Sequence, residues 1–381
     1  MNIYLSGVFD GPLTGQLQTL LGVKNSLEES HNLKLIKFPK LTIYYFFTWS
    51  LFIFRIFSIV FTQSKDKDIF YVVINRSKIS FWLRDLPVFL IALVTKSKII
   101  CHLVGSDIEE FVKKSSRIEN FLLVKIFSKV DTWILLGNSM KKQIINTYEY
   151  LNIKNHSNCF YDNQLNAYFL RGFYPEESES FFDDISFKNK IDNFGKNLKI
   201  TYMSNLMEDK GIVEFIESVI NLNEEFNLKI DVYIAGAIIE NSSERLKKAL
   251  KDASKRKYIN FLGLVQGKKK WNLLSKTDIF ALPTYYKTEA LPLSLVEAMR
   301  FGCFCISSNI GEINDLLKDE RGELIENVTT KNLTRSIQLV LSNINLAKHK
   351  INNSYLYAKN EFSYKSYKEN LIKIMNIQIG K

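Results

Sequence analysis

The feature that most restricts the fold of this chain is an alternation of short apolar runs with helix-like stretches. In the second half, an apolar run at 199–203 is followed by a loop and by a helical pattern at 211–221. The alternation continues, with further strands expected at 229–235, 259–261, 279–282 and 303–307, and further helices at 243–255, 268–274, 293–301 and 313–317. Apolar strands that are separated by helices indicate a parallel sheet covered on both faces.

The first half of the chain shows the same alternation. A strand at 2–8 precedes a glycine-bearing turn and a helical pattern that runs through Leu27. Further apolar runs at 69–74, 99–104 and 132–136 are separated by helical stretches. The polar stretch at 174–196 lacks a clean periodicity, and we place a linker in it.

The length of 381 residues exceeds what a single hydrophobic core usually supports. We therefore expect an α/β fold with two Rossmann-like lobes, residues 1–180 and 197–330, whose parallel sheets face each other across a cleft. The helical pattern of residues 331–381 predicts a tail that packs back on the N-terminal lobe.

The stretch 283–302 joins a buried strand to a helix and is the most informative part of the chain. Pro292 suits the first turn of a helix and Gly302 suits its end, so residues 293–301 should be helical. Because this helix begins at the carboxyl end of a strand, the free N–H groups near Leu293 and Ser294 form a site for a diphosphate.

Two glutamates lie near the start of this helix. Glu289 precedes it and Glu297 lies about two turns along it, so their carboxylates should contact different parts of a ligand. A carboxylate can accept two hydrogen bonds from neighbouring hydroxyls, which suits one glutamate to a ribose and the other to a sugar ring. Taken alone, a pair at this spacing is more often two surface glutamates.

The residues around the pair resemble the signature of glycosyltransferase family 4, as found in bacterial capsule and O-antigen enzymes. In that family two glutamates separated by seven residues lead into a segment like E-A-M-A-x-G, and this chain matches it with Glu289, Glu297, Ala298, Met299 and Gly302. The later stretch 309–315 resembles the family's glycine turn and acidic residue. The resemblance implies the two-lobed GT-B fold and a retaining glycosyl transfer.

A second match lies at 204–211, which resembles the family's G-R-L-x-x-x-K-G loop. The resemblance implies that Lys210 reaches the diphosphate of the sugar donor, where a lysine can neutralise the charge on a departing nucleoside diphosphate. We therefore expect neither a metal ion nor a cofactor. Asn205 stands where the family usually has arginine, so one positive charge is missing from the loop.

Weaker similarities complete the C-terminal lobe. Gly236 ends a stretch like the family's strand-end Ala-Gly, and Val265 belongs to an F-x-G-x-V stretch that lines the nucleobase pocket in the family. The resemblance thus implies that Glu289 and Lys210 are catalytic. The donor-binding residues that it implies are Glu297, Asn205, Leu291, Leu293, Ser294, Gly15, Gly236 and Val265.

The N-terminal lobe resembles the family more loosely. Gly15 belongs to a stretch like the glycine-rich first loop, whose backbone comes close to the donor phosphate, although such a loop alone is usually an ordinary turn. The stretch 101–107 resembles an H-x-H-G-x-D strand end, which makes His102 and Asp107 candidates for the acceptor side of the cleft. Val104 replaces one expected histidine, and a core histidine is an equally good interpretation of His102.

The segment 41–62 is about long enough to cross a bilayer. Arg55, several hydroxyl side chains and scattered aromatics favour a helix that lies at a membrane interface, and a buried helix and a spanning helix are the alternatives. The net charge of +11 suits phosphate-bearing ligands, an anionic membrane surface or nucleic acid, but no motif that stacks on bases or reads a groove is present.

The four cysteines show no paired C-x-x-C spacing, so we expect buried thiols rather than a metal site. The opening residues do not read as a signal peptide, and the cytoplasm is the expected compartment.

These features predict a retaining, metal-independent hexosyltransferase that uses a UDP- or GDP-sugar. Its acceptor would be a glycan or a lipid-linked oligosaccharide of lipopolysaccharide or capsule, at the inner leaflet of the plasma membrane. One alternative is a catalytically silent membrane-associated partner protein, suggested by Asn205, Val104 and the missing glycine after Glu289. A nucleotide-sugar epimerase would need acid and base residues that the sequence does not offer. The sugar, nucleobase, acceptor, linkage and oligomeric state have no local code.

Overall fold

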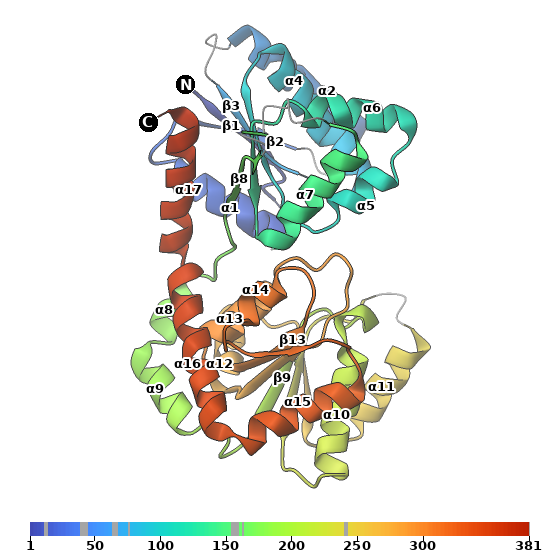
Figure 1. The fold of residues 1–381 in the computed structure, drawn as a ribbon, viewed down its shortest axis with the longest axis vertical. Helices are drawn as coiled ribbons and strands as arrows, with labels where there is room; N and C mark the ends of the chain where they lie inside the picture. Colours follow the sequence, from blue (N-terminus) through green and yellow to red (C-terminus); the bar gives the residue numbers. More distant parts are fainter. Residues whose placement is uncertain are drawn as a thin grey trace. The chain divides into compact units, whose positions relative to one another are not determined.

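The computed structural model describes residues 1–10, 14–38, 45–62, 68–74, 77–153, 160–161, 164–239 and 243–380. The chain divides into two compact units. Met1–Gly172 and Tyr367–Lys381 form unit 1, and Phe173–Ser366 form unit 2. Each unit contains a six-stranded sheet with helices packed against it (Figure 1).

The sheet of unit 1 is parallel throughout and has the order β2-β1-β3-β4-β5-β8. Its strands are β1 (Ile3–Gly7), β2 (Leu33–Lys37), β3 (Ile69–Val73), β4 (Lys98–His102), β5 (Thr132–Leu135) and β8 (Ala167–Phe169), and β6 (Phe160–Tyr161) with β7 (Gln164–Leu165) forms a small antiparallel pair. Its helices are α1 (Gly15–Leu27), α2 (Tyr45–Thr62), α3 (Lys78–Ser80), the π-helical turn Phe81–Asp85, α4 (Leu86–Val94), α5 (Ile108–Lys113), α6 (Arg117–Phe127) and α7 (Asn138–Tyr150). The central strands β1 and β3 are fully buried, as expected for a sheet covered on both faces.

The sheet of unit 2 is also parallel, in the order β11-β10-β9-β12-β13-β14. Its strands are β9 (Lys199–Met203), β10 (Asp231–Ala235), β11 (Ile259–Gly263), β12 (Ile279–Leu282), β13 (Phe304–Ser308) and β14 (Glu323–Ile325). Its helices are α8 (Glu177–Phe181), α9 (Asp184–Asp192), the 3-10 turn Glu208–Lys210, α10 (Ile212–Glu224), α11 (Glu244–Ser254), α12 (Gly267–Lys276), α13 (Leu293–Arg300), α14 (Ile313–Leu317), α15 (Thr330–Ser342) and α16 (Ile344–Glu361). This order is that of a doubly wound Rossmann sheet. The sheet of unit 1 has the other common doubly wound order, in which the second strand lies at the edge beside the first. The predicted α/β fold with two parallel, doubly wound sheets is therefore confirmed.

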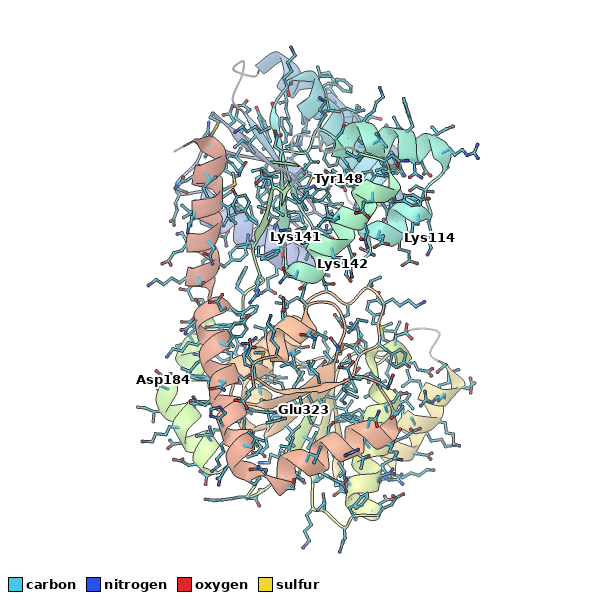
Figure 2. All side chains as sticks on the ribbon, in the orientation of Figure 1. Lys114, Lys141, Lys142, Tyr148, Asp184 and Glu323 are labelled. Atoms are coloured by element: carbon cyan, nitrogen blue, oxygen red, sulfur yellow. The ribbon has the colours of Figure 1, made fainter. Side chains whose placement is uncertain are left out.

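The polar stretch 174–196, expected to be an irregular linker, instead contains α8 and α9 and belongs to unit 2. Asp184 lies at the start of α9 (Figure 2). It accepts hydrogen bonds from Tyr355 and Lys359 of α16, at 2.6 and 2.7 Å. Contacts with a distant helix stabilise α9, so its local pattern alone did not predict it.

The helical tail is divided between the two units. Helices α15 and α16 belong to unit 2, whereas the last helix, α17 (Tyr364–Ile379), belongs to unit 1 from Tyr367 onward. In unit 1 the side-chain carbonyl of Gln378 accepts a hydrogen bond from the Thr132 hydroxyl at 2.8 Å, and its main-chain carbonyl accepts one from Lys98 at 2.8 Å. Only this last helix packs on the N-terminal unit in the way expected of the whole tail.

Helix α2 covers most of the segment 41–62, which was predicted to touch a membrane. The first four residues of that segment, 41–44, lie outside the described residues. Phe52 and Ile56 are buried, while Leu51, Phe54 and Phe57 are exposed, so the helix is neither fully buried nor fully solvated. In the described parts of the chain, no helix combines the length and the apolar character needed to span a bilayer.

Cys101, Cys303 and Cys305 are buried and form no disulfide among the described residues, as expected of core thiols. Cys159 lies outside the described residues.

Candidate active site

The two predicted catalytic residues lie at the middle of the sheet of unit 2. The first strand of the unit, β9, is hydrogen-bonded to the fourth, β12. From β9 the chain extends the sheet in one direction through β10 and β11, and from β12 it extends the sheet in the other. Ligands of doubly wound sheets bind at the carboxyl ends of such a strand pair. Lys210 lies in the loop after β9 and Glu289 in the loop after β12.

Lys210 reaches the second loop because two backbones approach each other closely. Gly211 follows it with a left-handed φ of +72°, and a Cβ atom on Gly211 would lie 1.9 Å from the carbonyl oxygen of Pro283. The Tyr285 N–H donates a hydrogen bond to the carbonyl of Asp209 at 2.8 Å, which ties the same two loops together. A residue with a Cβ atom does not fit here, which explains the Lys-Gly pair in the sequence.

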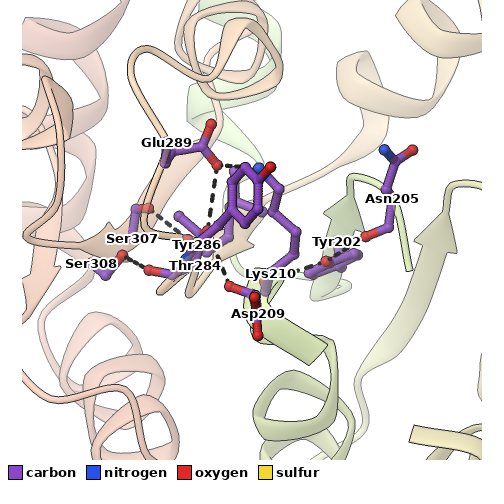
Figure 3. A network of polar contacts seen from close by, with 10 residues as sticks. Tyr202, Asn205, Asp209, Lys210, Thr284, Tyr286, Glu289, Ser307 and Ser308 are labelled. Carbon is purple, nitrogen blue, oxygen red and sulfur yellow. Dashed lines mark hydrogen bonds and ion pairs between the residues drawn. The ribbon is translucent and has the colours of Figure 1, made fainter. Parts of the chain in front are cut away.

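The carboxylate of Glu289 forms an ion pair with Lys210 (Figure 3). Both side chains are largely buried, with 13% of the lysine and 10% of the glutamate exposed. The Lys210 ammonium also lies 4.5 Å from the centroid of the Tyr286 ring. The cation is thus held between a carboxylate and an aromatic face.

The backbone of Glu289 is fixed from its other side by the turn that contains Gly311. A Cβ atom on Gly311, whose φ is +55°, would lie 2.3 Å from the carbonyl oxygen of Glu289. The next residue, Glu312, donates its N–H to the carbonyl of Ala290 at 2.8 Å. The predicted glycine turn therefore packs against the loop that carries Glu289 and holds it in place.

A layer of buried hydroxyl groups supports Glu289 (Figure 3). Thr284 Oγ1 lies 3.4 Å from Glu289 Oε2 and 3.3 Å from the carbonyl of Asp209, so it can donate to either. The Ser308 hydroxyl donates to the carbonyl of Thr284, and the Ser307 hydroxyl donates to that of Leu282 at 2.6 Å. These bonds satisfy buried polar groups and limit the movement of the loop.

The start of α13 has the properties of an anion site. Pro292 precedes the helix, and the first hydrogen bond of the helix runs from the Leu295 N–H to the carbonyl of Pro292 at 3.0 Å. The N–H groups of Leu293 and Ser294 therefore precede the hydrogen-bonded turns, as the first N–H groups of a helix do. Leu291, just before the helix, is partly exposed.

Glu297 is the fifth residue of α13, so it lies about one turn along the helix rather than the two turns expected. Its Oε1 atom lies 2.5 Å from the Nζ atom of Lys270 on α12, and the glutamate side chain is 9% exposed. Burial raises the pKa of Glu297 above its usual value, and the charge of Lys270 opposes this rise.

The remaining candidates of unit 2 lie in neighbouring loops. The side chain of Asn205 is exposed. The Tyr202 hydroxyl can donate to the main-chain carbonyl of Asn205, at 3.2 Å, or to that of Lys210, at 3.3 Å. A Cβ atom on Gly236 would lie 1.8 Å from the carbonyl of Ser204, so the loops after β9 and β10 are in backbone contact. Val265 lines a hollow of about 350 Å³ between β10, β11 and α12.

The candidates of unit 1 have different environments. Gly15 is the first residue of α1 and is exposed. A Cβ atom added to it would have no other atom within 4 Å. Residues 11–13 of the preceding loop lie outside the described residues. Asp107 is partly exposed and precedes α5. His102 is wholly buried at the end of β4, with Nδ1 2.8 Å from the Tyr71 hydroxyl. Burial lowers the pKa of His102 to about 3, and this environment favours the interpretation of His102 as a neutral core residue.

The sequence did not indicate three side chains that contact the candidate residues, namely Lys270, Thr284 and Tyr286. Lys270 is 27 residues from Glu297, and it is the third of three successive lysines at the start of a helix, where a solvated face is the usual interpretation. Thr284 and Tyr286 lie within the stretch that carries the signature, so their position is the only signal they offer.

Residues 183–357 match the model of a protein family described as Glycosyl transferases group 1. The capsular polysaccharide biosynthesis glycosyltransferase CapH of Staphylococcus aureus is 25% identical over 155 residues, which are 40% of this chain and 42% of that protein. The match therefore spans less than half the length of this curated relative.

The fold is similar to that of several solved structures. A crystal structure of HepE from Anabaena in complex with UDP and glucose has a TM-score of 0.68 at 12% identity and covers 99% of this chain and 100% of that chain. Sucrose-phosphate synthase from Thermosynechococcus elongatus has a TM-score of 0.71 at 12% identity, over 100% and 99% of the two chains. A glycosyltransferase from Rickettsia africae has a TM-score of 0.68 at 14% identity, over 99% and 98%. The fold is that of the GT-B glycosyltransferases, and the family match supports a transferase.

Proposed function

We propose that this chain is a retaining glycosyltransferase that moves a sugar from a nucleotide-sugar to a glycan acceptor without a metal ion. The observation that carries the proposal is the Lys210–Glu289 ion pair, which lies at the switch point of a doubly wound sheet. The loop of Glu289 leads directly into the N-terminus of α13. A cation, free N–H groups and two separate carboxylates together suit a sugar diphosphate with a ribose.

Each residue has a distinct role in the proposed reaction. The N–H groups of Leu293 and Ser294 and the ammonium of Lys210 bind the diphosphate, Glu297 accepts hydrogen bonds from the ribose hydroxyls, and Glu289 positions the sugar. The bond between the anomeric carbon and the phosphate oxygen breaks, and Lys210 stabilises the negative charge on the leaving diphosphate. The acceptor hydroxyl attacks the same face of the sugar and gives its proton to the departing phosphate. The transition state resembles an oxocarbenium ion.

The proposed reaction needs no general base from the protein. This agrees with the burial of His102, which keeps its imidazole away from solvent. It also needs no metal ion, because Lys210 and the helix N-terminus supply the positive field at the diphosphate. Structures of HepE hold UDP and UDP-glucose, which supports a nucleotide-sugar as the donor; we propose a UDP- or GDP-sugar.

We further propose that the acceptor is lipid-linked and that unit 1 binds the anionic inner leaflet of the plasma membrane from the cytoplasm. Helix α2 exposes Leu51, Phe54 and Phe57 at a spacing of three residues, and Arg55 lies beside them. Exposed apolar side chains with a neighbouring cation suit a membrane interface. The similarity to CapH supports a role in surface polysaccharide synthesis.

We propose that basic residues of unit 1 contact the phosphates of such an acceptor. Lys141 and Lys142 lie about one turn along α7, which follows the carboxyl end of β5, and Lys114 directly follows α5, which packs against α7 (Figure 2). The carboxyl ends of parallel strands are where ligands of open α/β sheets bind.

The test is binding and turnover of UDP-, GDP- and ADP-sugars in the presence of EDTA, with the wild type and the variants Lys210→Ala and Glu297→Ala. We expect one nucleotide class to bind, both variants to bind it more weakly, and EDTA to have no effect. A wild type that binds none of these donors would overturn the proposal in favour of a catalytically silent partner protein. A requirement for a divalent cation would overturn its metal-independent part alone.

A further inference from the structure

The buried carboxylate of Glu297 has a cationic partner that comes from a different helix. Lys270, the fourth residue of α12, places its Nζ atom 2.5 Å from Glu297 Oε1 on α13. The lysine side chain is 20% exposed and the glutamate 9%, so both groups have lost most of their hydration. A charge-assisted hydrogen bond in such a setting fixes the orientation of both side chains.

Three other cations near α13 are engaged elsewhere. The guanidinium of Arg300, one turn further along α13, lies over the rings of Tyr174 and Tyr355. On α16, which packs against α13, Lys350 pairs with Glu323. The ammonium of Lys190, on α9, donates to the carbonyls of Leu274 and Phe301 at 2.8 and 2.6 Å. Within the described residues, Lys270 is therefore the cation that acts on Glu297.

We propose that Lys270 is a positioning residue of the donor site, which keeps Glu297 ionised and oriented so that it accepts hydrogen bonds from the ribose hydroxyls. This inference rests on the proposed function, because it assumes that Glu297 binds a ribose. A protonated carboxyl group has fewer acceptor sites than a carboxylate, so a neutral Glu297 binds a vicinal diol less well. Burial already favours the neutral form, and Lys270 opposes that effect.

The first experiment measures donor affinity as a function of pH by calorimetry. The probe is UDP-glucose, or the GDP- or ADP-sugar that the wild type binds best. Both phosphates of such donors are esterified, so the charge of the probe does not change near neutral pH. Lys270→Met should bind about tenfold more weakly near neutral pH, and its affinity should begin to fall at a higher pH than that of the wild type. Lys270→Arg should keep most of the affinity, and Lys268→Met, an exposed lysine on the same helix, should not change it.

The second experiment separates an effect through Glu297 from a direct contact with phosphate. The probe is the same nucleotide-sugar with 2′-deoxyribose, which lacks one of the two hydroxyls. Lys270→Met should weaken binding of the ribose donor much more than that of the deoxyribose donor. In a Glu297→Gln background, Lys270→Met should have little further effect. Equal losses for both donors would show a direct phosphate contact and would overturn the proposal.

The outcomes also separate this inference from the proposed function. A wild type that binds no nucleotide-sugar contradicts the proposed function. A wild type that binds one, together with a Lys270→Met variant of unchanged affinity and pH dependence, contradicts only the role of Lys270. Circular dichroism and thermal unfolding check that each variant folds. If Lys270→Met does not fold, Lys270→Gln replaces it, because glutamine keeps a hydrogen-bond donor without the charge.

Discussion

At the scale of single residues, Gly211 controls whether Lys210 can reach Glu289. A Cβ atom at this position would lie 1.9 Å from the carbonyl oxygen of Pro283, and the φ of +72° is itself unfavourable for alanine. We expect Gly211→Ala to lower the free energy of unfolding by about 2 kcal/mol or more and to lower kcat/KM by about 100-fold, because Lys210 moves away from the leaving group. Chemical unfolding and steady-state kinetics measure the two effects.

Gly195→Ala is the matched control for this variant. Gly195 also has a left-handed φ, of +84°, but the nearest atom to its added Cβ would be the flexible end of Ile344 at 3.2 Å. We expect this control to lose stability from backbone strain alone and to keep its activity. Equal loss of activity in both variants would mean that Gly211 has no specific role in placing Lys210.

His102 makes the stability of unit 1 depend on pH. Burial lowers its folded pKa to about 3, below the ordinary value of about 6.5 in the unfolded chain. The unfolded state therefore takes up a proton first, so the stability present above about pH 6.5 is lost as the pH falls from there toward about 3. Between about pH 7 and about pH 5, the wild type should lose about 2 kcal/mol more than His102→Gln in urea unfolding. Parallel pH curves for the two proteins would contradict this prediction.

The residues of the candidate site differ in how far the sequence indicated them. Lys210 and Glu289 are 79 residues apart, yet each lies in a local motif, so both were predicted and their ion pair joins the two motifs. Lys270 belongs to no motif. Its ion pair with Glu297 is known only from the structure, in which α12 lies near α13. Side-chain pairs between distant segments have no local pattern, so only the fold can identify them.

At the scale of elements, the exposed face of α2 is the feature that bears on the proposed membrane contact. Phe54 is 74% exposed and Phe57 54%, which is unusual for large aromatic side chains in a folded unit. We expect Phe54→Glu with Phe57→Glu to reduce binding to vesicles that contain anionic lipid by about tenfold or more, because each change removes apolar burial and adds a negative charge. Co-sedimentation with vesicles measures the change.

Helix α6 offers a matched control, since Ile118 and Phe121 are also exposed on unit 1, by 76% and 61%. The pair Ile118→Glu and Phe121→Glu changes the net charge equally. It should leave vesicle binding largely unchanged apart from the general electrostatic effect. If both pairs reduce binding to the same extent, α2 is not a specific docking element.

Most elements of the two sheets could be predicted because their signals are local. The strands β9, β12 and β13 lie in mostly apolar runs, and their predicted positions agree with the structure to within one residue. The edge strands β2, β8 and β14 were not predicted, since they are short and only partly buried. An edge strand is stabilised on one side only, so its sequence is less restricted than that of a central strand.

At the scale of the whole molecule, the last helix returns the chain to the unit in which it began. Helix α17 starts in the final residues of unit 2 and from Tyr367 belongs to unit 1, where Leu371 and Met375 are fully buried. Unit 1 is thus built from both ends of the chain, and its stability depends on residues that follow the whole of unit 2. Neither end of the sequence alone contains the complete core of unit 1.

Leu371→Ala should therefore destabilise unit 1 and leave unit 2 unaffected. Loss of a buried leucine costs about 2–5 kcal/mol, a large fraction of the stability of a domain. In hydrogen exchange resolved by peptide, protection should fall in β1, β3 and β4 and remain in β9, β12 and β13. Leu356→Ala on α16, where the leucine is 46% exposed, is the control and should change neither set. An equal loss of protection in both units would mean that they unfold as one cooperative body, and the division of the chain into two units would then have no energetic counterpart.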